Sequence, residues 1–367
     1  MADILIKAPG KEDYEVIIEK DFSRLNEKLA SFDIANKKVC IVSDSTVFPI
    51  YGEEVKGIFE KCCKEISTLI LEVGEVSKSL EDVGCAYKLL LDRGFNRSDY
   101  IVALGGGVVG DYSGFVAATY KRGMNFIQIP TSLQAMVDSS IGGKVGIDYE
   151  NYQNHIGAFK QPKLVYSNAA CLNTLDDIQF YSGFAQAMKY AIIKSSSVYE
   201  WLIDKLYEIS DKDIDVLCDM IEQTVNIKKI YIEKDPFDLN GDRALLNLGQ
   251  TVGNALERSK NYNLTHGECT ALGIIAAAHI SLKRNMLSLE EYLEIRDMFV
   301  PFNLPITVED IDFDDILNNI KADKKQSEDG LAFILLKKIG KAVICRDVSD
   351  EEITEALKEL RYEETND

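Results

Sequence analysis

One stretch of the chain, residues 100–159, constrains the fold more than any other. An apolar run over 100–104 leads into three consecutive glycines, Gly105, Gly106 and Gly107, and a helical pattern follows. This order predicts a strand, a tight turn and a helix start, in which backbone N–H groups can approach a pyrophosphate closely. The stretch therefore favours an α/β domain that binds a nucleotide.

Strand and helix patterns alternate through the first half of the chain. Interleaving of this kind favours a mostly parallel sheet covered on both faces. Strand patterns cover 38–43, 68–73, 100–104, 126–129 and 163–167, and a helical pattern covers 80–93. From about residue 173 the period is helical, over 176–195, 197–209, 212–234, 243–259, 266–285 and 289–299, with one hairpin of strands 331–336 and 342–345. We predict a Rossmann-like α/β nucleotide-binding domain over 1–172 and an all-helical domain over 173–367.

The composition excludes several classes of protein. The 367 residues carry a formal net charge of −19, which repels nucleic acid and anionic membranes. No apolar stretch reaches the roughly 18 residues of a membrane span, and the first residues lack the apolar core of a secretory signal. Eight scattered cysteines without CxxC spacing are typical of a reducing compartment. We therefore expect a cytoplasmic protein without nucleic-acid or membrane partners, whose anionic ligands are held by local clusters of Lys and Arg.

Longer motifs lie on both sides of the glycine turn. They include GEVSK (74–78), GGGVVGD (105–111), FVAATYKRG (115–123), PTSLQAMVDSSIGGKVGI (130–147), NHIGAFKQP (154–162), GFAQAMKYAII (183–193), RALLNLGQTVGNALE (243–257) and HGECTALGI (266–274). With these motifs the chain resembles the 3-dehydroquinate synthase family of sugar-phosphate cyclases over nearly its whole length. The resemblance implies a homodimer, an active site between the two domains, and a tightly held NAD that is recycled within each turnover.

The resemblance also implies roles for individual residues. Arg122 matches an arginine that reaches in from the partner subunit, and the motifs leave open the choices between Lys228 and Lys229 and between Lys324 and Lys325. The positions that match cofactor contacts are Asp44, Glu75, Lys78, Gly105, Gly106, Gly107 and Asp111. The positions that match catalytic or substrate contacts are Asp138, Lys144, Asn154, Lys228, Arg243, Asn247 and Lys324, and Lys189 is a further candidate catalytic residue.

The metal-binding part of the family pattern is replaced. The family holds a divalent metal, usually zinc, with one Glu and two His, and the corresponding positions here are Gln186, Gln250 and His266. Two further catalytic positions, a histidine and a lysine in the family, are Asn254 and Gln153. Zinc prefers thiolate, imidazole and carboxylate ligands, for which a neutral carboxamide is a poor substitute. We therefore expect weak metal binding or none.

Two of the expected helices carry polar residues along one face. At about 100° per residue, the members of each set fall on a common side of their helix. Such a stripe on an otherwise apolar helix predicts either the wall of a wet site or a polar network in the core. The first set, on 243–259, is Arg243, Asn247, Gln250 and Asn254, and the second, on 176–195, is Gln186, Lys189 and Tyr190.

Only two histidines lie outside the metal pattern. His155 belongs to the NHIGAF motif and is a candidate replacement ligand. His279 lies in the apolar segment AAAHI and is expected to pack in a core, as is the small residue Cys269.

Three functions agree with these observations. The first is an active cyclase of the shikimate pathway of aromatic amino acid biosynthesis, which converts 3-deoxy-arabino-heptulosonate 7-phosphate into 3-dehydroquinate and phosphate. In that case Lys189, Lys144 or Lys228 would polarise the reacting oxygen electrostatically. The second is a divergent enzyme acting on another phosphorylated sugar, and the third is an inactive NAD- or ligand-binding relative. The intact cofactor and anion positions favour an enzyme.

Overall fold

The chain folds into two compact units, each of which is described by itself. The computed structural model describes residues 1–8, 13–150, 152–239, 241–260, 263–325 and 332–362, with the backbone alone at 323–325. Unit 1 comprises Met1–Leu175 and Lys212–Phe237, and unit 2 comprises Asp176–Asp211 and Asp238–Asp367.

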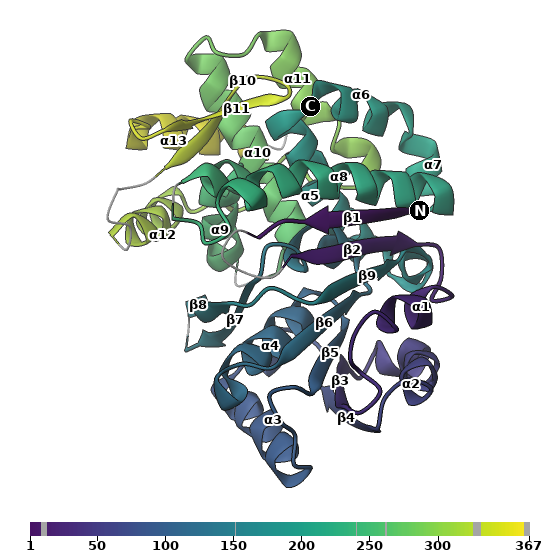
Figure 1. Ribbon diagram of the computed structural model, residues 1–367. Coiled ribbons are helices and arrows are strands. Elements are labelled where there is room, and N and C mark those ends of the chain that lie inside the picture. The colour runs from purple at the N-terminus through teal and green to yellow at the C-terminus, as the bar shows by residue number, and fades with distance from the viewer. Residues whose placement is uncertain (9–12, 151, 240, 261–262, 326–331, 363–367) are drawn as a thin grey trace. The chain divides into compact units, whose positions relative to one another are not determined.

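A sheet of seven strands lies at the centre of unit 1, in the order β1-β2-β9-β6-β5-β3-β4 (Figure 1). The pair β1–β2 is antiparallel, and the other neighbouring pairs are parallel. The mostly parallel α/β sheet is therefore confirmed, and all five predicted strands are present. The strands are β1 (Ala2–Ile6), β2 (Tyr14–Glu19), β3 (Lys38–Asp44), β4 (Glu65–Leu71), β5 (Tyr100–Gly105), β6 (Asn125–Pro130) and β9 (Leu164–Asn168).

Helices α3 (Leu80–Asp92) and α4 (Gly107–Thr119) contribute to one apolar core with this sheet. The same core contains buried side chains of β7 (Lys144–Tyr149), which pairs antiparallel with β8 (Tyr152–Phe159). The sequence did not predict β7 and β8, because β8 is exposed along most of its length and lacks an alternating pattern. The remaining α-helices of the first 175 residues are α1 (Leu25–Leu29) and α2 (Glu53–Glu60).

Helix α8 (Ile214–Lys234) belongs to unit 1. It lies beside β1 in Figure 1, and it contacts β1, β2 and the short π-helix η4 (Ala135–Ser139). The predicted boundary at residue 172 placed this segment in the helical domain. A helical period identifies an apolar face but not the partner that covers it, so the boundary is corrected for 212–237.

Unit 2 is built from helices and one hairpin. The predicted hairpin is confirmed as β10 (Phe333–Lys338) paired with β11 (Lys341–Cys345), whereas the last two helices were not predicted. The helices are α5 (Asp177–Lys194), α6 (Ser196–Asp204), α7 (Leu206–Ser210), α9 (Gln250–Ser259), α10 (His266–Lys283), α11 (Leu289–Asp297), α12 (Phe313–Lys325) and α13 (Asp350–Leu360).

The segment predicted as one helix over 243–259 is divided into two elements. A 3₁₀ helix, η6 (Asp242–Asn247), precedes α9, and Gly249 between them has a left-handed φ of 80°. A Cβ at this glycine would lie 2.8 Å from the carbonyl oxygen of Thr270 on α10. Glycine is therefore required both by the backbone angle and by the close approach of α10.

This break corrects the polar face predicted for the segment. Arg243 and Asn247 lie in η6, and Gln250 and Asn254 lie in α9. Since a 3₁₀ helix and a left-handed residue both change the direction of successive side chains, the four residues do not share one helix face.

Two observations concern cellular context. Over the part of the chain that the structure describes, none of the helices is long and apolar enough to cross a bilayer. All eight cysteines lie in that part and are free thiols.

Candidate functional site

The glycine turn connects β5 to α4 at the carboxyl edge of the parallel sheet. Gly106 is the N-cap of α4 in an extended conformation, and no side chain of the described residues caps this helix end. The first N–H groups of α4 lie at the positive end of the helix dipole, and no hydrogen bond from a capping side chain occupies them among the described residues. A Cβ on Gly107 would lie 3.1 Å from Ser139 Oγ. The turn therefore fits a pyrophosphate, which backbone N–H groups bind at such an end.

Asp44 ends strand β3, which neighbours β5 in the sheet. Its Oδ1 accepts hydrogen bonds from the N–H groups of Thr46 and Val47, both at 2.8 Å. These bonds fix the carboxylate at the same edge as the glycine turn. A carboxylate in this position is suited to bonding ribose hydroxyls.

Lys78 lies at the centre of a buried charge cluster. Its side chain is 2% exposed, and its Nζ is 2.5 Å from Asn154 Oδ1, 3.1 Å from Glu75 Oε2 and 3.4 Å from Asp111 Oδ2. Burial disfavours the charged ammonium, but Asp111, Glu75 and Asp148 outweigh this effect and raise the pKa of Lys78. The structure thus brings three predicted cofactor residues together with one predicted substrate residue, Asn154.

Asp111 is the unusual acid of this cluster. Burial raises the pKa of its carboxyl group from 3.8 to about 7, although the Lys78 ammonium opposes the shift. Asp111 thus takes up or releases its proton close to neutral pH. Asp148, which the sequence did not single out, accepts from the Asn154 N–H at 2.8 Å and is 3.7 Å from Lys78 Nζ.

Lys228 on α8 pairs with Asp138 on η4. The Lys228 side chain is 5% exposed, and its Nζ donates to the Asp138 carboxylate and, at 2.5 Å, to the Asp138 carbonyl oxygen. Lys229 points elsewhere, with its Nζ 3.9 Å from Glu233 Oε1. Of the two lysines that the motif left open, Lys228 is the one beside a predicted site residue. Lys144 is the exposed first residue of β7.

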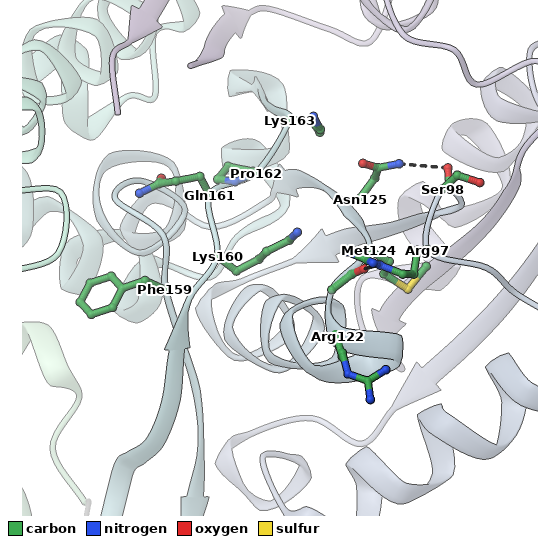
Figure 2. A pocket seen from close by; sticks show the side chains of 11 residues that line it. Arg97, Ser98, Arg122, Met124, Asn125, Phe159, Lys160, Gln161, Pro162 and Lys163 are labelled. Carbon is green, nitrogen blue, oxygen red and sulfur yellow. Dashed lines mark hydrogen bonds between the residues drawn. The ribbon is translucent and has the colours of Figure 1, made fainter. Parts of the chain in front are cut away.

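A pocket lined by basic residues lies at the other edge of the same sheet. Its volume is about 590 Å³, and none of the described residues that line it is acidic. Figure 2 shows Arg97, Arg122, Lys160 and Lys163 around it. These residues precede the starts of β5, β6 and β9, whereas the glycine turn follows the end of β5.

The position of this pocket limits what Arg122 can contact. Strands β5 and β6 pair in parallel from Tyr100–Asn125 to Gly105–Pro130. Five residue steps along a strand separate the two edges by about 17 Å. Arg122, which precedes β6, therefore lies toward the edge of the sheet opposite to the glycine turn of its own chain.

Helix α5 of unit 2 carries Gln186 and Lys189 on its buried side. Gln186 is 0% and Lys189 is 1% exposed. Gln186 Nε2 donates to Thr270 Oγ1 on α10 at 3.1 Å, while its Oε1 is buried and has no hydrogen-bond partner among the described residues. Thr270, which sequence reasoning missed, is marked only by its place in the HGECTALGI motif.

His266 is the first residue of α10, which begins with a capping box of Thr265 and Glu268. Its Nδ1 lies 3.2 Å from Glu257 Oε2 on α9. Helix α10 contacts both α5 and α9, so the helices that carry the three predicted metal positions pack together. Glu257, also missed, is the last residue of the RALLNLGQTVGNALE motif.

This set of side chains does not fit a divalent zinc ion. Within the described ranges, no group of three or more His, Cys, Asp and Glu side chains is placed to hold a metal. The Gln186 amide is already bonded to Thr270, and carboxamides are weak ligands for zinc.

The remaining predicted residues lie as follows. His155 is exposed on β8, with Nδ1 2.9 Å from the Gln153 carbonyl oxygen. His279 and Cys269 are buried in α10, as predicted, and burial lowers the pKa of His279. Arg243 is buried and Asn247 exposed in η6. Lys324 belongs to α12, but its side chain and that of Lys325 lie outside the described residues.

Two known three-dimensional structures have the same fold. One is 2-epi-5-epi-valiolone synthase from Streptomyces hygroscopicus with NAD+ and Zn2+ bound, with a TM-score of 0.88, 24% identity, and coverage of 95% of this chain and 97% of the other. The second is 2-deoxy-scyllo-inosose synthase complexed with carbaglucose-6-phosphate, NAD+ and Co2+, with a TM-score of 0.87, 23% identity, and coverage of 98% and 100%. At these identities the likeness establishes the fold.

Sequence comparisons identify the family. The model of the 3-dehydroquinate synthase N-terminal region matches residues 68–182, and the model of the C-terminal region matches residues 183–326. The 3-dehydroquinate synthase of Acetivibrio thermocellus is 37% identical over 341 residues, covering 93% of this chain and 94% of that protein. The 3-dehydroquinate synthase of Dehalococcoides mccartyi strain BAV1 is 36% identical over 363 residues, covering 98% and 100%. The chain therefore belongs to the 3-dehydroquinate synthase family.

Proposed function

We propose that this chain is an NAD-dependent cyclase that converts 3-deoxy-arabino-heptulosonate 7-phosphate into 3-dehydroquinate and phosphate. It would thus be a carbon–oxygen lyase of the shikimate pathway, and the free thiols fit a cytoplasmic location. The observation that carries the proposal is the carboxyl edge of unit 1, where the uncapped turn of α4, Asp44 and the Lys78 cluster occur together.

The residues of that edge fit NAD. The first N–H groups of α4 would hold the pyrophosphate, and Asp44 would hold ribose hydroxyls. When bound, NAD supplies reversible hydride removal at one substrate carbon. Glu75, Lys78 and Asp111 would orient the nucleotide from the cluster beside the turn.

Lysine and arginine side chains of the chain would bind and stabilise the negative charge of the substrate. Lys228, held in place by Asp138, presents a buried ammonium that stabilises an oxygen as it gains negative charge. Lys144, Asn154, Arg243, Asn247 and Lys324 would hold the phosphate, carboxylate and hydroxyls, and Lys189 would add positive charge from α5. We derive no step through a metal, because the side chains at the family position do not fit one.

We also propose that the enzyme is a homodimer in which Arg122 serves the partner subunit. The support is the place of Arg122 at the amino edge, distant from its own glycine turn. Mixing Arg122→Ala and Lys144→Ala variants, each with low activity, is expected to restore activity to about a quarter of the wild-type value in statistically formed heterodimers. If subunit exchange is verified and the activity does not recover, this result contradicts a role of Arg122 across the interface.

The assay that tests the activity is phosphate release from the heptulosonate phosphate in the presence of NAD, with the cyclic product identified by NMR. A Gly107→Val variant is the control, because it retains the substrate residues while blocking the turn. Release of phosphate without the cyclic product would exclude a complete cyclase.

A second function is favoured by one observation, the set of amides at Gln186, Gln250, Asn254 and Gln153 in place of the family's ionisable side chains. An enzyme of this kind would use the same cofactor on another phosphorylated sugar. Turnover of glucose 6-phosphate, but not of the heptulosonate phosphate, would identify it. NAD binding without turnover of either compound would instead identify an inactive relative.

A further inference from the structure

The centre formed by α5, α9 and α10 contains an acceptor atom that the proposed mechanism has not used. Gln186 Oε1 is buried and lacks a hydrogen-bond partner among the described residues. An unpaired buried acceptor destabilises a protein relative to a satisfied one. Such a cost is consistent with an atom that a ligand satisfies.

The other half of the same amide is fixed. Nε2 donates to Thr270 Oγ1 at 3.1 Å, and the N–H of Gly267 donates to Ser182 Oγ at 2.9 Å, so α5 and α10 are joined at Gln186 and again about one turn before it. The position of the Gln186 amide group is therefore set by the protein before any ligand arrives. A fixed acceptor of this kind selects a hydrogen-bond donor in a defined position.

The charge around Gln186 determines which ligand fits. Its oxygen carries no net charge, and the buried Lys189 lies one turn further along α5. Residues three apart on a helix are neighbours, so the Lys189 side chain leaves α5 beside that of Gln186, and its Nζ lies 4.8 Å from the centroid of the Tyr190 ring. The carboxylate of Glu257 is bonded to His266 Nδ1. A neutral acceptor beside an ammonium suits a hydroxyl on an anionic compound better than a divalent cation.

We infer that, in this chain, the family's metal position is a metal-free site in which Gln186 Oε1 accepts a hydrogen bond from a hydroxyl of the sugar-phosphate substrate. The inference rests on the proposed function for the identity of the substrate but not for the absence of metal. The side chain of Gln has the shape of Glu, so the exchange removes the charge and leaves the helix packing as it is.

The first experiment measures metal binding and needs no turnover. Purified wild-type protein, titrated with Co2+ and followed by visible absorption, is expected to give no saturable d–d band and to contain less than about 0.1 zinc ion per chain. The double variant Gln186→Glu/Gln250→His, with His266 unchanged, is expected to gain a band that saturates at one Co2+ per chain. Stoichiometric metal in the wild type overturns the inference, as does a folded double variant that gains no band.

The second experiment tests the hydroxyl contact. Gln186→Met removes both polar atoms while keeping the length of the side chain, and Gln179→Met is a matched control on the exposed side of α5. We expect KM for the heptulosonate phosphate to rise about 10-fold in Gln186→Met and to change less than 2-fold in the control. A lowered melting temperature with KM unchanged would show a structural role only and overturn the contact. If the wild type fails to turn over the substrate, the proposed function fails, while the metal titration still decides the metal-free site.

Discussion

The carboxyl edge of unit 1 and the α5–α9–α10 centre of unit 2 match the family pattern to different extents. At the edge, the proposed nucleotide contacts are backbone N–H groups of α4 and carboxylates with defined partners. At the centre, two of three metal positions are carboxamides, one of them fixed by Thr270. Backbone N–H groups can bind a phosphate only where glycine leaves space for it, whereas a metal site depends on the charge of its ligand side chains. Replacing Glu by Gln therefore removes a metal site without disturbing the fold, whereas blocking the nucleotide turn requires a side chain at one of its glycines.

The largest effect that separates the two regions is expected from Gly107→Val. A Cβ at this position already lies 3.1 Å from Ser139 Oγ, and a branched side chain would occupy the space in front of the helix N–H groups. We expect NAD affinity to fall at least about 100-fold, equivalent to about 2.8 kcal/mol, by isothermal titration calorimetry. Gly84→Val on α3, where nothing lies within 4 Å of the added Cβ, should leave the affinity unchanged. Equal losses in both variants would refute the pyrophosphate turn.

The next effect compares two adjacent lysines of α8. Lys228→Met removes the buried ammonium that pairs with Asp138, and we expect kcat/KM to fall about 30-fold, equivalent to about 2 kcal/mol. Lys229→Met, which removes only a distant contact to Glu233, should change kcat/KM less than 2-fold. Steady-state kinetics measures both variants. A larger loss of kcat/KM in Lys229→Met than in Lys228→Met would contradict the proposed role of Lys228.

The smallest effect concerns the dependence of stability on pH. Because the folded-state pKa of Asp111 is raised from 3.8 to about 7, the folded protein binds a proton that the unfolded chain has released over this interval. The contribution of Asp111 to the free energy of unfolding therefore falls as pH rises from about 4 to about 7. We expect Asp111→Asn to remove this dependence and to gain about 1–3 kcal/mol relative to the wild type at pH 8.

Urea unfolding at pH 5 and pH 8 measures the effect, with the exposed Asp92→Asn as the control for net charge. Lys78 keeps Glu75 and Asp148 as counter-charges in the variant. If Asp111→Asn were less stable than the wild type at both pH values by the same amount, the carboxyl group would be ionised throughout and the raised pKa would be wrong.

The structure could be predicted from the sequence where residues close together in the chain determine the local conformation. The apolar run before Gly105 and the helical period after it predict the strand, turn and helix correctly. The polar stripe over 243–259 was wrong because one residue, Gly249, takes a left-handed conformation where α10 approaches. The helical period of a segment cannot predict a contact with another helix that lies about twenty residues further along the chain. The same holds for α8, whose apolar face packs on β1 and β2 rather than within unit 2.

The sequence by itself determined the family, the parallel sheet, the glycine turn and the loss of two metal-ligand side chains, since residue type decides backbone freedom, strand pattern and ligand charge. Only the tertiary structure decided that Lys228 rather than Lys229 meets Asp138, that Lys78 gathers three carboxylates, and that Gln186 has one satisfied and one unsatisfied end. These outcomes depend on distances between elements remote in the chain. Burial then determines how strongly each charge or polar atom needs a partner.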